Sequence, residues 1–493
     1  MEPLILAALV AAAALAALAV ARARIRGGVP QPWSLPWWGE TSAALADPAA
    51  LRERLHARHG PVYASVFLGN RYVAVRGFDD VRALLNGEHA LVETEWPAPI
   101  RRLLGPGSVS TTHFGAHKKL RAALAPVFAP RAVAASLPRV AAILRKHFDR
   151  WVAEGPGLRG AAAVKAATFE VIVDVGMGFP PDWSTPANLA LFTSLFDTWL
   201  GGFAPGASSL PGGKLAKGLA ARREMIRIID GVVAPAVAAR RAVPLPDRAP
   251  PASTLDRLAD AVDEDGKELP VGTLSTVALN VLFAGHETSS QILTLLLRTL
   301  HPNAAGTTRP DLLAALRAEQ AAVVAAHGDE ITQASLDAAP LAAACVKEQL
   351  RLTPVVSQVF RRTLVPIPLN KGACVVPAGE VVVLDLEHTI AADARWAGEP
   401  PASPLHPSRF EPTRWTEGGL AARKEGGWLP FGGGARYCVG WALATAELGA
   451  ALALLARTYE WSLHNPEAGV GVPPAPRAPK DGLVMTVRRA SEE

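Results

Sequence analysis

The residues best suited to chemistry lie in a glycine-rich stretch that runs from Phe431 to Gly440 and reads FGGGARYCVG. Glycines permit backbone angles that a side chain would forbid, and Gly440 lets a large flat group lie against the chain just past Cys438. The apolar run that follows predicts a helix, so free N–H groups and the helix dipole would favour thiolate over thiol at Cys438. The stretch predicts a metal-ligating sulfur, and the alternative is a glycine-rich turn around an ordinary buried cysteine.

A second candidate group lies inside a long helix predicted over residues 271–300, which is apolar almost all round and therefore expected to be buried. Its middle reads AGHETS and contains Gly285, Glu287 and Thr288. A carboxylate beside a threonine in such a helix is costly unless it serves a purpose. The alternatives are that Glu287 is half exposed and that Thr288 bonds back to its own helix.

The joint pattern Phe-x-x-Gly-x-Arg-x-Cys-x-Gly resembles the haem-binding loop of the cytochrome P450 family, and residues 27–490 carry four motifs in that family's order. The resemblance implies a haem b cofactor whose iron is ligated by the Cys438 thiolate. Phe431 would then pack beside the sulfur, and Arg436 would pair with a haem propionate. The cofactor-binding residues implied by the resemblance are Cys438, Arg436, Phe431, Gly432, Gly434, Gly440, His117, Arg121 and Arg361, with Arg362 as the alternative to Arg361.

The helix motif resembles the oxygen-activation site of the same family. On that resemblance Gly285 leaves room for dioxygen, Thr288 donates a hydrogen bond during oxygen activation, and Glu287 connects it to a proton supply as general acid. Glu348-x-x-Arg351 resembles the family's structural ion network. Its third member is predicted in the segment 407–410, which reads PSRF and has Ser408 where the family often has an acidic residue.

The substrate region is predicted from the long irregular segment between Gly87 and Phe114, because the matching loop in the family roofs the substrate. Trp96 and Ile100 in this loop, and Val355 and Val356 further on, are candidate pocket residues. The stretches 107–113 and 117–119 resemble most closely the branch that includes retinoic acid, brassinosteroid and related isoprenoid hydroxylases. A lipophilic substrate such as a sterol, a terpenoid or a fatty acid is expected.

The predicted fold is mainly α with a small β region, a cytochrome P450 fold with one N-terminal transmembrane helix. Between residues 4 and 20 every residue is Ala, Leu, Ile or Val, and Arg22, Arg24 and Arg26 follow. This pattern predicts a membrane anchor with the catalytic part in the cytosol, at the endoplasmic reticulum if the cell is eukaryotic. A cleaved signal peptide is the alternative. The predicted domains are an anchor with its basic flank (1–26), a proline-rich hinge (27–50) and a catalytic domain (51–493).

Other elements follow from local patterns. Residues 61–75 alternate like a hairpin that turns at Gly69-Asn70. The segment 180–217 is broken by proline and glycine and is apolar where it is not broken, so in a membrane-anchored chain it could dip into lipid and gate substrate entry. Helices are predicted over 51–59, 79–85, 115–128, 131–154 and 160–179, and short strands over 366–386.

Composition narrows the function classes. Hydrophobic residues make up 49% of the chain and charged residues 19%, as in a globular protein with a sizeable core. The net charge of +5 and the lack of long basic runs argue against nucleic-acid binding. The three cysteines, Cys345, Cys374 and Cys438, lack the spacing of a metal cage and suit a reducing compartment.

The main hypothesis is a membrane-anchored haem-thiolate monooxygenase. No flavin or nicotinamide fingerprint is present, so electrons would come from a separate NADPH-dependent flavoprotein reductase, with cytochrome b5 as a second candidate donor. A basic docking face is predicted at Lys118, Lys119, Arg423 and Lys424. The alternatives are a reductase-independent isomerase or dehydratase acting on hydroperoxides, and a non-catalytic haem-binding or lipid-binding membrane protein.

Overall fold

A computed structural model describes residue 10 and residues 27–32, 38–180, 183–393, 398–403, 405–416, 429–471 and 477–490. The predicted anchor, apart from Val10, lies outside these residues, as do Arg423 and Lys424 of the predicted docking face. Within the described ranges no helix combines the length and the apolar character needed to cross a bilayer.

The chain divides into two compact units, each built from separate stretches of sequence. The first contains residues up to Trp96 together with Val356–Asp393 and Gly432–Arg436. The second contains Pro97–Val355, Ala394–Phe431 and the chain from Tyr437 onward.

The first unit is built on a five-stranded sheet with the strand order β1-β2-β8-β5-β3. The predicted hairpin is confirmed, with Val62 opposite Val75 and Gly69 at φ +76° in the turn. Strand β2 runs parallel to β8, and the other neighbouring strands run antiparallel. The strands are β1 (Val62–Phe67), β2 (Asn70–Val75), β3 (Val92–Thr94), β5 (Gln358–Thr363) and β8 (Val381–Asp385), with a separate pair β6 (Ile367–Leu369) and β7 (Cys374–Val376).

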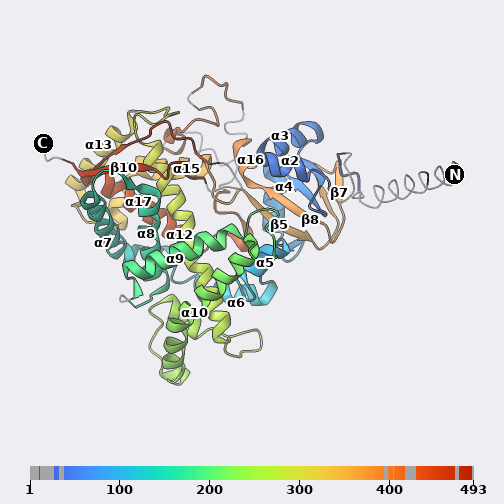
Figure 1. The fold of residues 1–493 in the computed structure, drawn as a ribbon, viewed down its shortest axis with the longest axis horizontal. Coiled ribbons are helices and arrows are strands. Elements are labelled where there is room, and N and C mark those ends of the chain that lie inside the picture. Colours follow the sequence, from blue (N-terminus) through green and yellow to red (C-terminus); the bar gives the residue numbers. More distant parts are fainter. Residues whose placement is uncertain are drawn as a thin grey trace. The chain divides into compact units, whose positions relative to one another are not determined.

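Short helices accompany this sheet (Figure 1): α2 (Thr41–Ala46), α3 (Pro48–His59), α4 (Phe78–Asn86), α16 (Leu386–Ala391) and the 3-10 turn η6 (Gly434–Arg436). Helix α3 starts where sequence chemistry favours a start. The Asp47 carboxylate accepts hydrogen bonds from the N–H groups of Ala49 and Ala50, and Pro48 occupies the first helical position.

The second unit is mainly helical. Its helices are α5 (Ala98–Leu104), α6 (Phe114–Leu124), α7 (Pro130–Glu154), α8 (Gly160–Val171), α9 (Pro186–Gly201), α10 (Lys214–Arg241), α11 (Thr254–Ala259), α12 (Val271–Thr299), α13 (Leu312–His327), α14 (Gln333–Asp337), α15 (Pro340–Leu352) and α17 (Trp441–Thr458). A π-helical turn, η1 (Ile172–Met177), continues α8, and 3-10 turns form at η3 (Leu245–Asp247) and η4 (Pro412–Trp415). A small sheet has the order β4 (Leu158–Arg159), β10 (Val484–Arg489), β9 (Tyr459–Leu463).

Helix α12 is the centre of this unit, as its apolar sequence predicts. It packs against α8, α10, α15 and α17 (Figure 1). Leu274, Val277, Leu282, Leu293 and Leu296 are each fully buried along it. A helix covered on several sides in this way can hold the groups in its middle away from bulk water.

Residues 87–114 were predicted to be irregular, and this prediction is wrong, because they include β3 and α5. Residues 180–217, which were predicted to be broken by proline and glycine, include the 16-residue helix α9. The buried residues of α9 are Leu189, Phe192, Phe196 and Trp199, which recur at helical spacing. The prolines and glycines that break the sequence pattern lie at the two ends of α9, where they start and stop the helix.

Candidate functional site

The cysteine loop is closed by a backbone hydrogen bond in which the Cys438 N–H donates to the Phe431 carbonyl over 2.9 Å. Gly434 has φ +60°, and a Cβ there would come within 2.0 Å of the Leu85 carbonyl oxygen at the end of α4. No other residue can take this place without moving α4 or the loop. A Cβ on Gly440 would meet nothing of the chain within 4 Å, which fits a flat group lying beside the cysteine.

Opposing effects act on the pKa of Cys438. Burial raises the pKa of the thiol, whereas the backbone N–H of Gly440 lowers it, in the direction predicted for the helix start, and so does the cation of Arg121. Burial has the larger effect. A bound metal ion supplies the missing positive charge, since a coordinating thiol is deprotonated by the metal. The donor set thus fits a thiolate-ligated haem iron.

In the first unit the predicted propionate partners Arg361 and Arg436 share one buried carboxylate, Glu88. The Arg436 Nε donates to Glu88 over 2.9 Å, and the Arg361 Nε lies 2.7 Å from the second oxygen of Glu88. The N–H of Thr94 also donates to Glu88 over 3.0 Å. Burial lowers the pKa of Arg361, and the Glu88 charge opposes that shift. Two cations facing one carboxylate leave one positive charge in excess, which suits an anionic partner.

Strand β5 places only one of the two arginine candidates for propionate binding in a buried position. Side chains alternate along β5, so Arg361 is buried while Arg362 points outward and pairs with Glu95 over 3.3 Å. Sequence reasoning missed Glu88, because nothing local distinguishes it from an exposed loop residue.

In the second unit His117 and Arg121 lie on one face of α6, at i and i+4. His117 is buried. Burial lowers the pKa of Arg121, whereas the neighbouring Cys438 raises it, so these two side chains interact electrostatically. Helix α6 thus brings Arg121, one of the two predicted propionate partners that it carries, within electrostatic reach of Cys438.

The acid–threonine pair occupies the middle of α12. Thr288 Oγ1 donates to the Ala284 carbonyl over 2.6 Å, which is the bond back to its own helix that the sequence left open. The Glu287 carboxylate lies 3.1 Å from Lys165 Nζ of α8, and Lys165 in turn lies 3.0 Å from Asp197 of α9. Burial disfavours the charged form of Lys165, but the charges of Glu287 and Asp197 outweigh it and raise the pKa of the amine. Glu287 therefore has a cationic partner that reaches towards solvent through Asp197.

The two residues before this pair also have structural roles. A Cβ on Gly285 would come within 2.4 Å of Ile172 in η1, so the glycine permits close packing of that turn on α12. His286 is fully buried between the rings of Phe169 and Phe196, at centroid distances of 5.1 and 5.4 Å. Neither of its ring nitrogens has a hydrogen-bond partner. Burial, assisted by the charge of Lys165, lowers the pKa of His286 to about 3, so the ring is neutral.

A further buried acid, which sequence reasoning missed, lies beside the same helix. Glu447 of α17 is completely buried, and burial raises the pKa of its carboxyl to about 8, although a hydrogen bond with Ser289 opposes the shift. Its Oε1 atom has no partner. Glu447 is thus protonated at neutral pH, and its contact residue follows Thr288 directly in α12.

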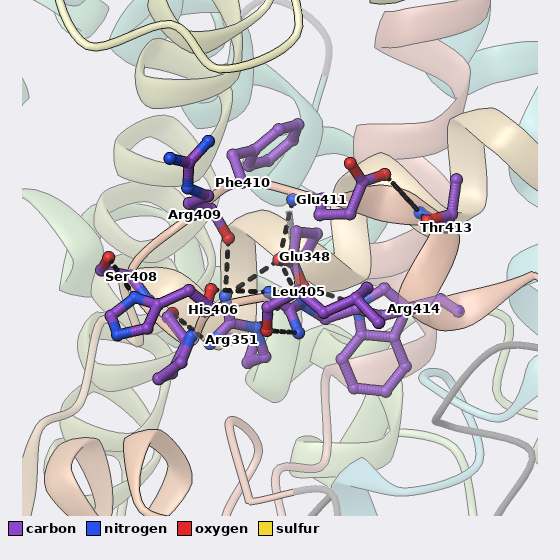
Figure 2. Close-up of polar contacts among 12 residues, drawn as sticks. Glu348, Arg351, Leu405, His406, Ser408, Arg409, Phe410, Glu411, Thr413 and Arg414 are labelled. Atoms are coloured by element: carbon purple, nitrogen blue, oxygen red, sulfur yellow. Dashed lines mark hydrogen bonds and ion pairs between the residues drawn. The ribbon is translucent and has the colours of Figure 1, made fainter. Parts of the chain in front are cut away.

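The structural ion network forms around Glu348 of α15, but its third member is not the one predicted. Arg414, rather than Arg409, donates to Glu348, over 3.0 Å, as Figure 2 shows. Arg409 contributes only its backbone carbonyl, which accepts from Arg351 over 3.1 Å. The segment 407–410 was chosen by its PxRF pattern, yet the turn η4 carries Arg414 inward and leaves the Arg409 guanidinium outside the network.

The network is saturated. Arg351 donates to both oxygens of Glu348, over 2.8 and 2.9 Å. The N–H of Glu411 and the indole N–H of Trp415 add donors at 3.0 and 2.8 Å. Four further bonds from the two arginines reach backbone carbonyls of Leu405, His406, Pro407 and Arg409. Such a cluster holds the scaffold and leaves no group for chemistry.

The predicted pocket residues fall in both units. In the first, Trp96 packs on Phe360 with ring centroids 5.7 Å apart, and Val356 is exposed. In the second, Ile100 and Val355 are half-buried against the hydrophobic core.

A cysteine loop preceding one buried helix, an acid–threonine pair inside another, and a buried Glu-Arg network define a haem-thiolate enzyme. The cytochrome P450 family model matches residues 30–486, and the chain belongs to that family. It is therefore an oxidoreductase of the monooxygenase type that uses haem with cysteine thiolate ligation.

Individual relatives agree. Cytochrome P450 26C1 of Homo sapiens is 30% identical over 87% of this chain and 83% of its own length. The solved structure of retinoic acid bound cyanobacterial CYP120A1 is 26% identical, with a TM-score of 0.79 over 94% of this chain and 99% of that one. This likeness confirms the predicted placement near the retinoic acid branch. Cytochrome P450SP alpha (CYP152B1), at 20% identity and a TM-score of 0.70, shares the fold.

Proposed function

We propose that the chain hydroxylates a lipophilic, retinoid-like small molecule with dioxygen and with electrons from a separate NADPH-dependent flavoprotein reductase. The overall reaction consumes the substrate C–H bond, dioxygen, two electrons and two protons, and it yields the alcohol and water. The observation that carries this proposal is the intact Glu287–Thr288 pair in the buried helix α12. A reaction that consumes protons needs such a pair.

Residues of this chain would hold the cofactor. Cys438 would supply the thiolate ligand, with Phe431 beside it and Gly432, Gly434 and Gly440 shaping the loop. Arg436, Arg361, His117 and Arg121 would provide cationic or hydrogen-bonding partners for the haem propionates. When bound through a thiolate, haem activates dioxygen for insertion of an oxygen atom into a C–H bond.

The protein's part in the chemistry lies in α12. Thr288 orients a hydroxyl beside the reaction site, and Glu287 moves protons to it from the outside. Lys165 holds the Glu287 carboxylate in the resting state at 3.1 Å, and it must release that carboxylate for the acid to turn towards Thr288. Gly285 was predicted to leave room for dioxygen, but the side chain of Ile172 packs against it, so this glycine serves the close packing of η1 on α12.

The lipophilic character of the substrate and the membrane location of the enzyme are inferred from the same considerations. A structural neighbour holds retinoic acid, a lipophilic acid, and the predicted apolar anchor at residues 4–20 would place the enzyme at a membrane where such molecules dissolve. We place the catalytic part in the cytosol, where the positive charges predicted for docking, Lys118, Lys119, Arg423 and Lys424, would attract an acidic reductase, with cytochrome b5 as a second donor.

An isomerase or dehydratase acting on hydroperoxides is the second candidate, and the intact acid–threonine pair disfavours it because such reactions consume no protons from outside. A non-catalytic haem or lipid carrier is disfavoured for the same reason. Labelling separates these candidates. With ¹⁸O₂, reductase and NADPH, a monooxygenase places one labelled oxygen atom in the product, whereas an isomerase needs neither reductant nor dioxygen.

The first experiment is the absorption spectrum of the dithionite-reduced protein with carbon monoxide, for the wild type and for Cys438→Ser. We expect a strongly red-shifted Soret band in the wild type that the variant lacks, because the shift requires thiolate ligation. A wild-type protein without haem, or with an unshifted band, would overturn the proposed function.

A further inference from the structure

Among the described residues, Arg222 of α10 has no anionic partner. Its Nη2 donates to the Thr276 hydroxyl of α12 over 3.1 Å, while its Nε is buried and has no hydrogen-bond partner. The guanidinium lies against the backbone just beyond α5, since a Cβ on Gly105 would come within 1.9 Å of Nη2. Three elements, α5, α10 and α12, therefore enclose it.

The electrostatics of Arg222 differ from those of other partly buried arginines in the described part of the chain. Burial alone lowers the pKa of Arg222. Burial likewise lowers the pKa of four others. Three of these have a carboxylate beside them that opposes the shift, Arg361 (Glu88), Arg414 (Glu348) and Arg457 (Asp329), and the fourth, Arg121, lies beside the predicted haem ligand Cys438. A guanidinium withdrawn from water costs free energy unless an anion compensates it. Within the described residues the chain itself provides no such anion for Arg222.

The position of Arg222 relative to the acid–threonine pair is set by α12. Thr276 lies 12 residues before Thr288 in that helix, which at a rise of roughly 1.5 Å per residue is about 18 Å. Between them Phe283 packs edge-on against Trp199 of α9 at 4.8 Å, and it stacks on Phe203 at 6.2 Å. The Trp199 indole donates to the Leu103 carbonyl of α5 over 3.2 Å, which ties these aromatic residues to the element beside Arg222. An aromatic, apolar stretch thus separates the cation from the reacting end.

We propose that Arg222, with the Thr276 hydroxyl, binds the carboxylate of an elongated lipophilic acid, which the enzyme oxidises at a carbon remote from that carboxylate. The guanidinium offers charged, planar donors that match a carboxylate. The separation of about 18 Å along the α12 axis between Thr276 and Thr288 would select long substrates and place their apolar end at the oxidising centre. This inference rests on the proposed monooxygenase function and specifies its substrate class.

The test compares an acid with its neutral ester. All-trans-retinoic acid and methyl retinoate are titrated into the haem-loaded full chain, and binding is followed both by calorimetry and by the shift of the Soret band. The variants are Arg222→Gln, Arg222→Lys and the matched control Arg223→Gln, which removes the same charge from the exposed neighbouring residue. Thermal unfolding of each variant is recorded alongside.

We expect Arg222→Gln to weaken binding of the acid by about 10- to 100-fold and to leave ester binding nearly unchanged, because a charged hydrogen bond is lost only for the acid. Arg222→Lys should retain part of the preference for the acid over the ester, and Arg223→Gln should retain all of that preference. Equal losses for acid and ester would assign Arg222 a packing role and overturn the proposal, as would unchanged binding of both ligands. Absence of the red-shifted carbon monoxide band would instead count against the proposed function, and calorimetry reports ligand binding independently of that band.

Discussion

Two buried polar regions of the helical unit contrast sharply: the Glu348 network and the middle of α12. Around Glu348 both carboxylate oxygens accept hydrogen bonds, from two arginines, an indole N–H and a backbone N–H. In and beside α12 several buried polar atoms lack a hydrogen-bond partner among the described residues. They are both ring nitrogens of His286 and one carboxyl oxygen of Glu447. Glu287 depends on a lysine that is itself shared with Asp197.

This difference in hydrogen-bond satisfaction separates polar groups that stabilise the fold from polar groups that can take part in the reaction. A saturated network is rigid and costs much to disturb. Groups left partly satisfied lower stability, yet they can change their protonation state or their hydrogen bonds when substrate and protons arrive. Proteins commonly tolerate such a cost at functional sites. Three substitutions test this contrast, in order of decreasing effect.

The largest effect is expected for Arg414→Gln. This change removes a buried charge whose Nε bonds Glu348 and whose other donors reach the carbonyls of Leu405 and His406. The loss should be about 3–5 kcal/mol in the free energy of unfolding, as for other broken buried ion pairs. Urea denaturation followed by circular dichroism measures it.

The matched control is Arg409→Gln, the same change five residues earlier. Only the carbonyl of Arg409 joins the network, so we expect a change below about 0.5 kcal/mol. Equal effects of the two substitutions would refute the assignment of Arg414 as the third member.

Glu447→Gln should remove a sensitivity to alkali. The folded-state pKa of about 8 lies above the ordinary value of 4.5, so its contribution to stability is complete below pH 4.5 and is lost as pH rises towards 8. At roughly 1.4 kcal/mol per pH unit, the wild type should lose about 2–3 kcal/mol between pH 6 and pH 8 from this residue. The variant should lack that loss in urea titrations at both pH values.

The control for this experiment is Glu460→Gln, which neutralises a half-exposed acid paired with Arg317 at 3.4 Å. This variant should keep the wild-type decrease in the free energy of unfolding between pH 6 and pH 8. A wild-type slope in Glu447→Gln would show that Glu447 is ionised in the folded protein.

His286→Phe should act in the opposite pH range and with a smaller effect. The folded-state pKa of about 3 lies below the ordinary value of 6.5, so the contribution to stability is complete above pH 6.5 and is lost as pH falls towards 3. Between pH 6.5 and pH 5 the wild type should lose about 2 kcal/mol, and the variant should not. Phenylalanine suits the cage formed by Phe169 and Phe196.

Thermal unfolding between pH 5 and pH 7 measures this difference, and the exposed His327 provides a control as His327→Gln. If His286→Phe kept the wild-type acid sensitivity, the ring would have to be paired in solution, and the contrast between the two regions would weaken.

Several elements followed directly from local sequence. The hairpin at residues 62–75 and the long helix α12 were predicted from alternation and from an apolar run, and both are present. The cysteine loop, the acid–threonine motif and the family were evident in the same way, because each depends on residues close together in the chain. Helix α9 was missed although its buried residues repeat at helical spacing, since flanking prolines and glycines masked the pattern.

What the amino-acid sequence determined by itself was the set of chemical groups: a cysteine for iron, an acid and a threonine in one helix, and a Glu-x-x-Arg pair. Tertiary structure alone decided the partners of those groups. Arg414, and not Arg409, binds Glu348, and Glu88 pairs with both Arg361 and Arg436. Lys165 pairs with Glu287, and Arg222 has no anionic partner among the described residues. The physical reason is range: helix and strand patterns repeat over a few residues, whereas ion pairs and burial depend on segments up to several hundred residues apart.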